Sequence, residues 1–301
     1  MNNRKKTYQT LASVAAVGGS LYAMNAAATK LTKSLLYRHH KEDDRPSLLE
    51  SRYQCENILI NNNEGVKLRG LFINQDNAQQ TLVILHPYAL EAKDMSLYVP
   101  FLKEYIKDSH ILLVDACAHG QSDGYIRGLG IKDVNDLVCW NQYLLGRFGK
   151  EHQLVLFGKE CGANTILNAA GKHVLKNVKA IISDGAYTSP QQILGYRLVQ
   201  DYKIPKMPML LLLQRKIKRA VHINIKEDTT NYVKHNDIPT LYIHLKNDDF
   251  VPLKMGYPLY NANRGKKELF VLKDEKYLYE LDSKSEMIKD FKQFIDQYVN
   301  C

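Results

Sequence analysis

Short, mainly apolar runs recur along the chain from residue 81 onward, and longer segments with helical character separate them. The runs cover residues 81–85, 111–114, 154–157, 178–182, 240–243 and 268–272. Runs of this length, bounded by turn-forming residues, are typical of strands that are buried on both faces of a sheet. Their alternation with helices predicts an α/β fold with a mostly parallel central sheet and helices on both faces.

Two further strands and a terminal helix extend this pattern. Residues 56–60 and 67–73 are expected to pair as strands, because residues 61–65 between them contain three asparagines and end in glycine. Residues 285–299 have the 3.6-residue apolar spacing of a final amphipathic helix.

Polar side chains follow several of the predicted strands. Because ligands bind outside the carboxyl ends of the strands in open α/β sheets, we expect these side chains to gather at one edge. They are His86, Tyr88, Asp115, Glu160, Asp184 and Asp248.

An uncharged segment occupies residues 11–28, after the basic residues Arg4, Lys5 and Lys6. At 1.5 Å per residue, a helix of this length just spans the ~30 Å hydrocarbon core of a bilayer. We therefore predict an N-terminal hydrophobic helix within residues 1–33 that anchors the chain in a membrane. A cleaved signal peptide and a soluble or interfacial helix are the alternatives.

The rest of the chain divides into a linker and one large domain. Residues 34–54 are polar and charged, which is typical of a linker, and we assign residues 55–301 to a single domain. Within that domain the strand–helix alternation breaks at about residues 189–236. This insertion contains an apolar run at 209–213 followed by a basic cluster, and we expect it to form a helical cap over the site.

A tight turn follows the apolar run at 154–157. Gly158 and Gly162 lie two residues on either side of Glu160. This is the G-x-S-x-G spacing of a nucleophile elbow, in which a strained strand-to-helix turn exposes the central side chain. A serine hydrolase carries serine at the position that Glu160 occupies here.

Five motifs in order resemble those of one family. They are His86-Pro87-Tyr88-Ala89, residues 115–124, residues 158–167, Asp184-Gly185-Ala186-Tyr187-Thr188-Ser189, and residues 238–252. In these motifs the chain resembles the α/β-hydrolases of the serine aminopeptidase and monoglyceride-lipase-like group. It looks most like the membrane-anchored type of low-GC Gram-positive bacteria. The resemblance implies the α/β-hydrolase fold, with its domain weakly favoured on the outer side of the cell membrane and either a single-pass helix or a signal anchor.

The resemblance also carries family roles onto particular residues. In this family the catalytic residues follow the order Ser, Asp, His. Glu160 stands at the nucleophile position and Asp248 at the acid position, with Asp249 as the alternative acid. Lys276 is the best match to the histidine, within a residue or two, and no histidine follows His244.

The oxyanion-hole positions of the family fall on Tyr88 and Cys161. Their backbone N–H groups are the ones expected to face an anion. The turn before them is altered, because Pro87 stands where the family has glycine.

Two of the three triad positions are therefore changed. We interpret the chain as a pseudoenzyme, a hydrolase-like protein that binds a small acyl or peptide ligand or acts as a scaffold. The alternative is an active hydrolase of ester or peptide bonds with a rearranged site. A further hypothesis places the Lys276 ammonium between the carboxylates of Glu160 and Asp248, as a structural ion-pair cluster.

Composition and charge indicate which classes of partner the chain could bind. The net charge is +9, with basic groups near the N-terminus and at residues 215–219. No nucleic-acid-binding motif accompanies them, so attraction to an anionic membrane surface is favoured over nucleic acid, with solvated basic faces as the alternative. The five cysteines lack metal-ligand spacing, and we expect neither a metal nor a cofactor.

Overall fold

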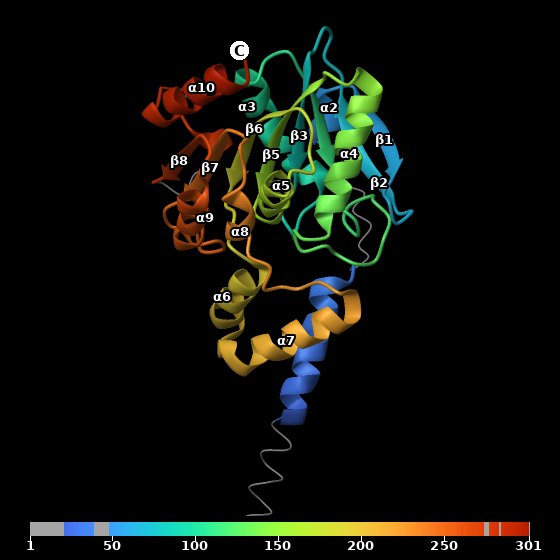
Figure 1. Ribbon diagram of the computed structural model, residues 1–301, viewed down its shortest axis with the longest axis vertical. Coiled ribbons are helices and arrows are strands. Elements are labelled where there is room, and N and C mark those ends of the chain that lie inside the picture. The colour runs from blue at the N-terminus through green and yellow to red at the C-terminus, as the bar shows by residue number, and fades with distance from the viewer. Residues whose placement is uncertain (1–20, 39–47, 274–276, 283, 301) are drawn as a thin grey trace, which may run out of the picture.

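An eight-stranded sheet organises the structure (Figure 1). The computed structural model describes residues 21–38, 48–273, 277–282 and 284–300. The strand order is β1-β2-β4-β3-β5-β6-β7-β8. The strands are β1 Cys55–Asn61, β2 Lys67–Ile73, β3 Gln80–Leu85, β4 Ser109–Val114, β5 Gln153–Lys159, β6 Val178–Asp184, β7 Thr240–Leu245 and β8 Lys267–Leu272.

The sheet is mostly parallel, as predicted. Strand β2 pairs antiparallel with β1 and with β4, and the pairs from β4 through β8 are parallel. The parallel strands are buried along most of their length, which explains why their sequences read as continuous apolar runs.

Helices cover both faces of this sheet. The helical elements are α2 Leu48–Arg52, η1 Ala92–Leu97, α3 Tyr98–Tyr105, α4 Asp133–Phe148, α5 Cys161–Gly171, α6 Pro190–Tyr202, α7 Lys206–Val221, α8 Thr230–Val233, η2 Leu253–Met255, α9 Tyr257–Ala262, η3 Leu278–Glu280 and α10 Glu286–Tyr298. Val155 and Phe157 of β5 share one apolar cluster with α3 and α10, whereas Leu154 and Leu156 share another with α4 and α5. Because successive side chains of a strand point to opposite faces of the sheet, one apolar run contributes to two cores.

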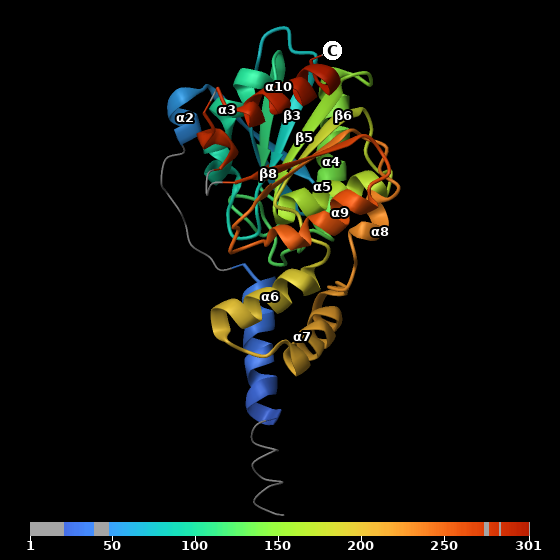
Figure 2. The ribbon, with the colours of Figure 1, turned by 90° about the vertical axis from the view of Figure 1, so that its left-hand side faces the viewer.

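A cap stands apart from the sheet at its carboxyl edge. Helices α6 and α7 form it, within the predicted insertion, and the helix at residues 21–36 runs beside them (Figures 1 and 2). A third apolar cluster joins Ala28 and Leu36 of the N-terminal helix to Leu198 of α6 and Leu213 of α7. The N-terminal segment therefore packs as a third helix of the cap.

The N-terminal helix is also tied to the main domain. The Leu35 carbonyl accepts a hydrogen bond of 2.7 Å from the Tyr88 hydroxyl, and the Leu36 carbonyl accepts one of 2.8 Å from the Arg127 amide. The guanidinium of Arg38 donates to the carbonyl oxygens of Gly120 and Ser122. These contacts fix the carboxyl end of the helix against the loop after β4.

The structure describes only part of the predicted membrane anchor. Residues 11–20 of the uncharged segment lie outside the described residues, as do residues 39–47 of the predicted linker. The helix at 21–36 continues past residue 33, where the sequence suggests that the hydrophobic segment ends. Across the described ranges, no helix combines the length and apolar character that crossing a bilayer requires.

Replacing Leu36 by alanine tests whether this helix belongs to the folded unit. Leu36 is fully buried, so Leu36→Ala should lower the free energy of unfolding by roughly 2–5 kcal/mol. Leu21, in the same helix, is 56% exposed, so Leu21→Ala should change it by less than about 0.5 kcal/mol. Urea denaturation measures both. Equal effects of the two changes would contradict the packing described.

Candidate functional site

The turn between β5 and α5 has the geometry of a nucleophile elbow. Strand β5 ends at Lys159, helix α5 begins at Cys161, and Glu160 between them has φ 50° and ψ −109°. A positive φ is strained for a residue with a long side chain, and such strain persists only where the surroundings enforce it. The side chain at position 160 is therefore held by the fold in an unusual, presented position.

The two glycines make this turn sterically feasible. A Cβ atom on Gly158 would lie 2.6 Å from the Ala163 nitrogen, and one on Gly162 would lie 2.6 Å from the Leu85 carbonyl oxygen. Both distances are far below van der Waals contact with backbone atoms, which have little freedom to move. Only glycine fits at either position, so strand and helix can approach closely enough to close the elbow.

A cavity of about 250 Å³ lies between the elbow and the cap. Its floor includes Glu160, Cys161 and Tyr88, and its walls come from the N-terminal helix, α6, α7 and neighbouring loops. The lining residues are Leu31, Ser34, Leu35, Tyr88, Ala89, Leu129, Glu160, Cys161, Tyr187, Pro190, Ile193, Leu194, Arg197, Leu198, Asp201, Tyr202, Leu213 and Phe250. The structure thus brings three of the predicted site residues into one mainly apolar cavity under the predicted cap.

The two residues at the oxyanion-hole positions have fixed side chains. The Tyr88 hydroxyl accepts a hydrogen bond of 3.1 Å from Arg127 while donating to Leu35. Burial raises the pKa of the Cys161 thiol well above its ordinary value. Cys161 is therefore a neutral thiol at physiological pH and has little nucleophilic character.

Asp248 lies in the loop after β7, and its side chain binds the backbone of that same loop. Its Oδ1 accepts hydrogen bonds from the backbone amides of Phe250, at 2.7 Å, and Val251, at 2.9 Å. It does not line the cavity, although its charge acts on Glu160. The neighbouring Asp249 is exposed, and its carbonyl accepts a hydrogen bond of 3.1 Å from Arg197. The assignment of Asp248 to the acid position remains a prediction.

Lys276 falls outside the described residues, so its predicted place between two carboxylates stays a prediction. A different lysine occupies this neighbourhood. Lys159 is buried, and its Nζ lies 3.0 Å from Oδ2 of Asp184. Burial lowers the pKa of Lys159, but the charges of Asp184, Glu160 and Asp248 outweigh that effect and raise it. Lys159 is therefore a permanent cation below the elbow.

The Lys159–Asp184 ion pair was not predicted from the sequence. The signal available was its position, because Lys159 is a charged residue at the carboxyl end of an otherwise apolar strand. Strands β5 and β6 run parallel with Lys159 opposite Asp184, and this register brings the two charges together.

The environment of Glu160 favours its protonated form. Burial is the largest cause, the Lys159 charge opposes it, and the charges of Asp184 and Asp248 reinforce it. The pKa of Glu160 is raised to about 7. Its carboxyl group thus changes charge close to physiological pH.

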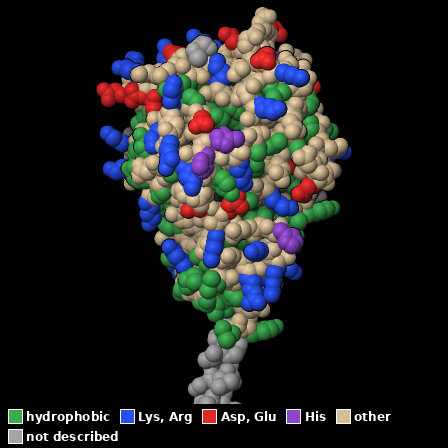
Figure 3. Space-filling model, viewed as in Figure 1, with side chains coloured by type: hydrophobic (Ala, Val, Ile, Leu, Met, Phe, Trp, Pro, Cys, Tyr) green, Lys and Arg blue, Asp and Glu red, His purple; other side chains and the backbone are tan. Residues whose placement is uncertain are grey.

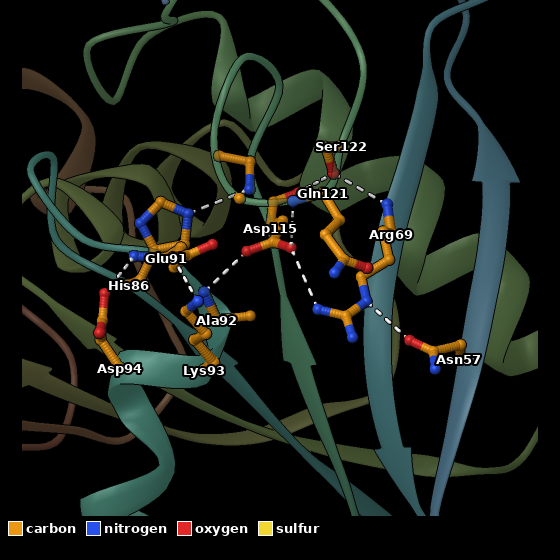
Figure 4. A network of polar contacts seen from close by, with 12 residues as sticks. Asn57, Arg69, His86, Glu91, Ala92, Lys93, Asp94, Asp115, Gln121 and Ser122 are labelled. Carbon is orange, nitrogen blue, oxygen red and sulfur yellow. Dashed lines mark hydrogen bonds and ion pairs between the residues drawn. The ribbon is translucent and has the colours of Figure 1, made fainter. Parts of the chain in front are cut away.

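A polar network braces the loops behind the elbow (Figure 4). Asp115 accepts hydrogen bonds from the amides of Ala92, at 2.7 Å, and Gln121, at 3.0 Å, and lies 3.5 Å from the Arg69 guanidinium. His86 Nε2 accepts one from the Ala116 amide at 3.1 Å. These side chains hold the ends of β3 and β4 in place.

His119 serves the same structural purpose, whereas His244 makes no such contact among the described residues. Both ring nitrogens of His119 lie 3.0 Å from main-chain carbonyl oxygens, those of Cys117 and Tyr88. Burial lowers the pKa of His119 to about 3 and that of His244 to about 4. His244 is fully buried against Gly256, away from the cavity lining. His119 is thus bound to the main chain, whereas both ring nitrogens of His244 are buried with no hydrogen-bond partner among the described residues.

Solved structures with the same arrangement include hydrolases. An esterase of Pyrococcus furiosus matches with a TM-score of 0.66 and 17% identity, covering 88% of this chain and 98% of that one. An esterase of Exiguobacterium antarcticum matches with a TM-score of 0.58 and 19% identity, over 82% of this chain and all of the esterase. An acylaminoacyl peptidase matches with a TM-score of 0.58 and 15% identity, over 82% of this chain and 42% of the peptidase. The chain has the α/β-hydrolase fold.

Two sequence relatives cover about three quarters of the chain. The uncharacterized protein YqkD of Bacillus subtilis is 25% identical over 232 residues, and the uncharacterized protein YfhR of Escherichia coli is 24% identical over 235. No family model matches the sequence. In the α/β-hydrolase fold the central residue of the elbow is the nucleophile, and in this chain that position presents the carboxyl group of Glu160.

Alanine substitution of two glycines, one in the elbow and one outside it, tests the packing of the elbow. Gly162→Ala should destabilise the fold by roughly 1–3 kcal/mol, because the added methyl group overlaps the backbone of β3. Gly146→Ala, in the last turn of α4 with open space around it, should stabilise by up to about 1 kcal/mol. Thermal and urea unfolding report both changes. A tolerated Gly162→Ala would show that the elbow is looser than described.

Proposed function

We propose that this chain is a non-hydrolytic member of the α/β-hydrolase fold that binds a small, mainly apolar ligand beneath its cap. The observation that carries the proposal is Glu160 on the strained elbow, at the floor of the cavity. The fold holds residue 160 in a strained backbone conformation that presents its side chain. A glutamate there offers a titratable carboxyl group in place of a serine hydroxyl.

The remaining lining supports binding over covalent catalysis. A serine nucleophile needs a histidine within hydrogen-bond reach, and no histidine lines the cavity among the described residues. The one serine of the lining, Ser34, lies on the N-terminal helix and not at the elbow. A carboxylate nucleophile needs a base to activate water in the second step, and no histidine among the described residues lines the cavity to supply one.

The shape and polarity of the cavity point to the class of ligand. Aliphatic side chains from the N-terminal helix, α6 and α7 form most of the wall, as is common for sites that bind acyl chains or apolar peptide side chains. An acyl or short peptide ligand fits this lining. The esterases and peptidase of the same fold provide a precedent for the location of the site, but not for its chemistry.

Association with a membrane surface is the second part of the proposal. Leu21, Tyr22, Met207 and Leu211 are exposed apolar side chains of the N-terminal helix and α7. Hydrophobic and basic side chains gather at the narrow lower end of the molecule (Figure 3). Exposed basic residues of the cap are Lys203, Lys206, Arg215, Lys218 and Arg219. Apolar residues among basic ones favour an anionic lipid surface, consistent with an N-terminal segment that anchors the chain there.

Labelling with a serine-reactive fluorophosphonate tests the absence of hydrolysis. The wild-type chain should show neither labelling nor turnover of p-nitrophenyl butyrate above the rate in buffer. Glu160→Ser combined with Lys276→His restores the residue types of the family at the elbow and at the predicted histidine position, and it should be labelled. Matched single variants show whether both residues are needed.

Ester turnover by the wild type that is lost in Glu160→Ala would contradict the proposal. That result would favour the alternative, an active hydrolase with a rearranged site. Turnover that survives Glu160→Ala would point to a contaminant or to a second site, and the phosphonate label distinguishes these by identifying the modified peptide.

A further inference from the structure

The charged side chains in and around the cavity at Glu160 are more negative than positive. The ionisable side chains that act on Glu160 are Lys159 beside it on β5, Asp184 at the end of β6, Asp248 in the loop after β7, and Arg197 on α6. Asp201 of α6 also lines the cavity. With Glu160 ionised, this set of described side chains holds four carboxylates and two cations.

Both of these cations are already paired. Lys159 contacts Asp184 at 3.0 Å. Arg197 contacts Asp201 at 2.7 Å, donates to the Asp249 carbonyl at 3.1 Å, and lies 4.4 Å from the centre of the Phe250 ring. Among the described residues, no hydrogen bond or ion pair joins the Glu160 carboxylate to another side chain. This carboxylate lines the cavity and has no paired cation among the described residues.

Most of the cavity wall around Glu160 is formed by uncharged, aliphatic side chains. Leu31, Leu35, Leu194, Leu198 and Leu213 come from three helices and enclose an aliphatic space. The cavity has a volume of about 250 Å³. A ligand that fits has a short apolar body and a head group that reaches the floor.

We propose that the cavity binds a primary ammonium group on a short apolar body, with the ammonium against the Glu160 carboxylate and the body among the cap leucines. This inference rests on the proposed function, since it assumes a ligand that is bound without being hydrolysed. An ammonium donates charge-assisted hydrogen bonds to a carboxylate, which are stronger in a partly desolvated site than in water. A fatty acid would instead place a second carboxylate against Glu160, and like charges repel.

The pH dependence follows from the same geometry. An alkylammonium keeps its charge across neutral pH, whereas Glu160 loses its proton as the pH rises through the midpoint of its titration. Binding of the ammonium should therefore strengthen from pH 6 to pH 8. Fatty-acid binding should weaken over the same range, and binding of a neutral alcohol should change little.

Three probes of equal chain length test the proposal on the full-length protein by isothermal titration calorimetry. Octylamine should bind at least tenfold more tightly than 1-octanol at pH 8, and octanoate should bind more weakly than either. Glu160→Gln keeps the shape and removes the charge, so it should abolish the preference for octylamine while retaining octanol. Retained octanol binding also shows that the variant is folded.

A comparison of two amines shows whether the bound ammonium belongs to a peptide or to a lipid-like molecule. Leucyl-leucinamide presents a peptide N-terminus, and octylamine resembles a lipid-derived amine. Whichever binds more tightly identifies the source, and either one supports the proposal if its binding depends on Glu160.

Two results would overturn the inference. One is equal affinity for octylamine and octanol in the wild type at pH 8. The other is octylamine binding that appears only in Lys276→Met, because the ammonium site would then already be filled by Lys276. Failure of the proposed function looks different: none of the three probes binds, or p-nitrophenyl octanoate is hydrolysed in a manner that depends on Glu160.

Discussion

The close approach of strand β5 and helix α5 is the constraint on which the site depends. Gly158 and Gly162 leave no room for a Cβ atom, so the chain passes between them through a backbone conformation with positive φ at residue 160. Whatever side chain stands there is directed into the cavity beneath the cap. The elbow thus decides where the functional group lies, and the sequence at position 160 decides what chemistry it offers.

In this chain that group is a carboxyl surrounded by other charges and by apolar walls. The ion pair of Lys159 and Asp184 lies nearby, and burial is the main reason why the pKa of Glu160 is raised. Above it, the N-terminal helix closes the cavity together with α6 and α7, held by contacts such as that of Leu35 with Tyr88. Segments from distant parts of the sequence therefore build one cavity.

Most of the fold follows from local patterns, whereas the site depends on register and packing. Buried parallel strands need continuous apolar runs, so the sheet and the elbow at Glu160 are visible in the sequence. The pairing of Lys159 with Asp184 requires the alignment of two strands, which no short motif encodes. The role of Leu35 was missed because residues 34–54 were assigned to a linker on their polar and charged character. Lys276 lies outside the described residues, so its predicted ion pair is still a prediction.

The most direct measurement of this account is the titration of the Glu160 carboxyl group in the folded protein. With glutamate labelled by ¹³C at the carboxyl carbon, the NMR resonance of Glu160 is the one that disappears in Glu160→Gln. The account predicts a titration midpoint near pH 7 for this resonance. A midpoint near 4.3, the value of a glutamate in water, would show that the carboxyl group is solvated and not held in the cavity, and would contradict the account.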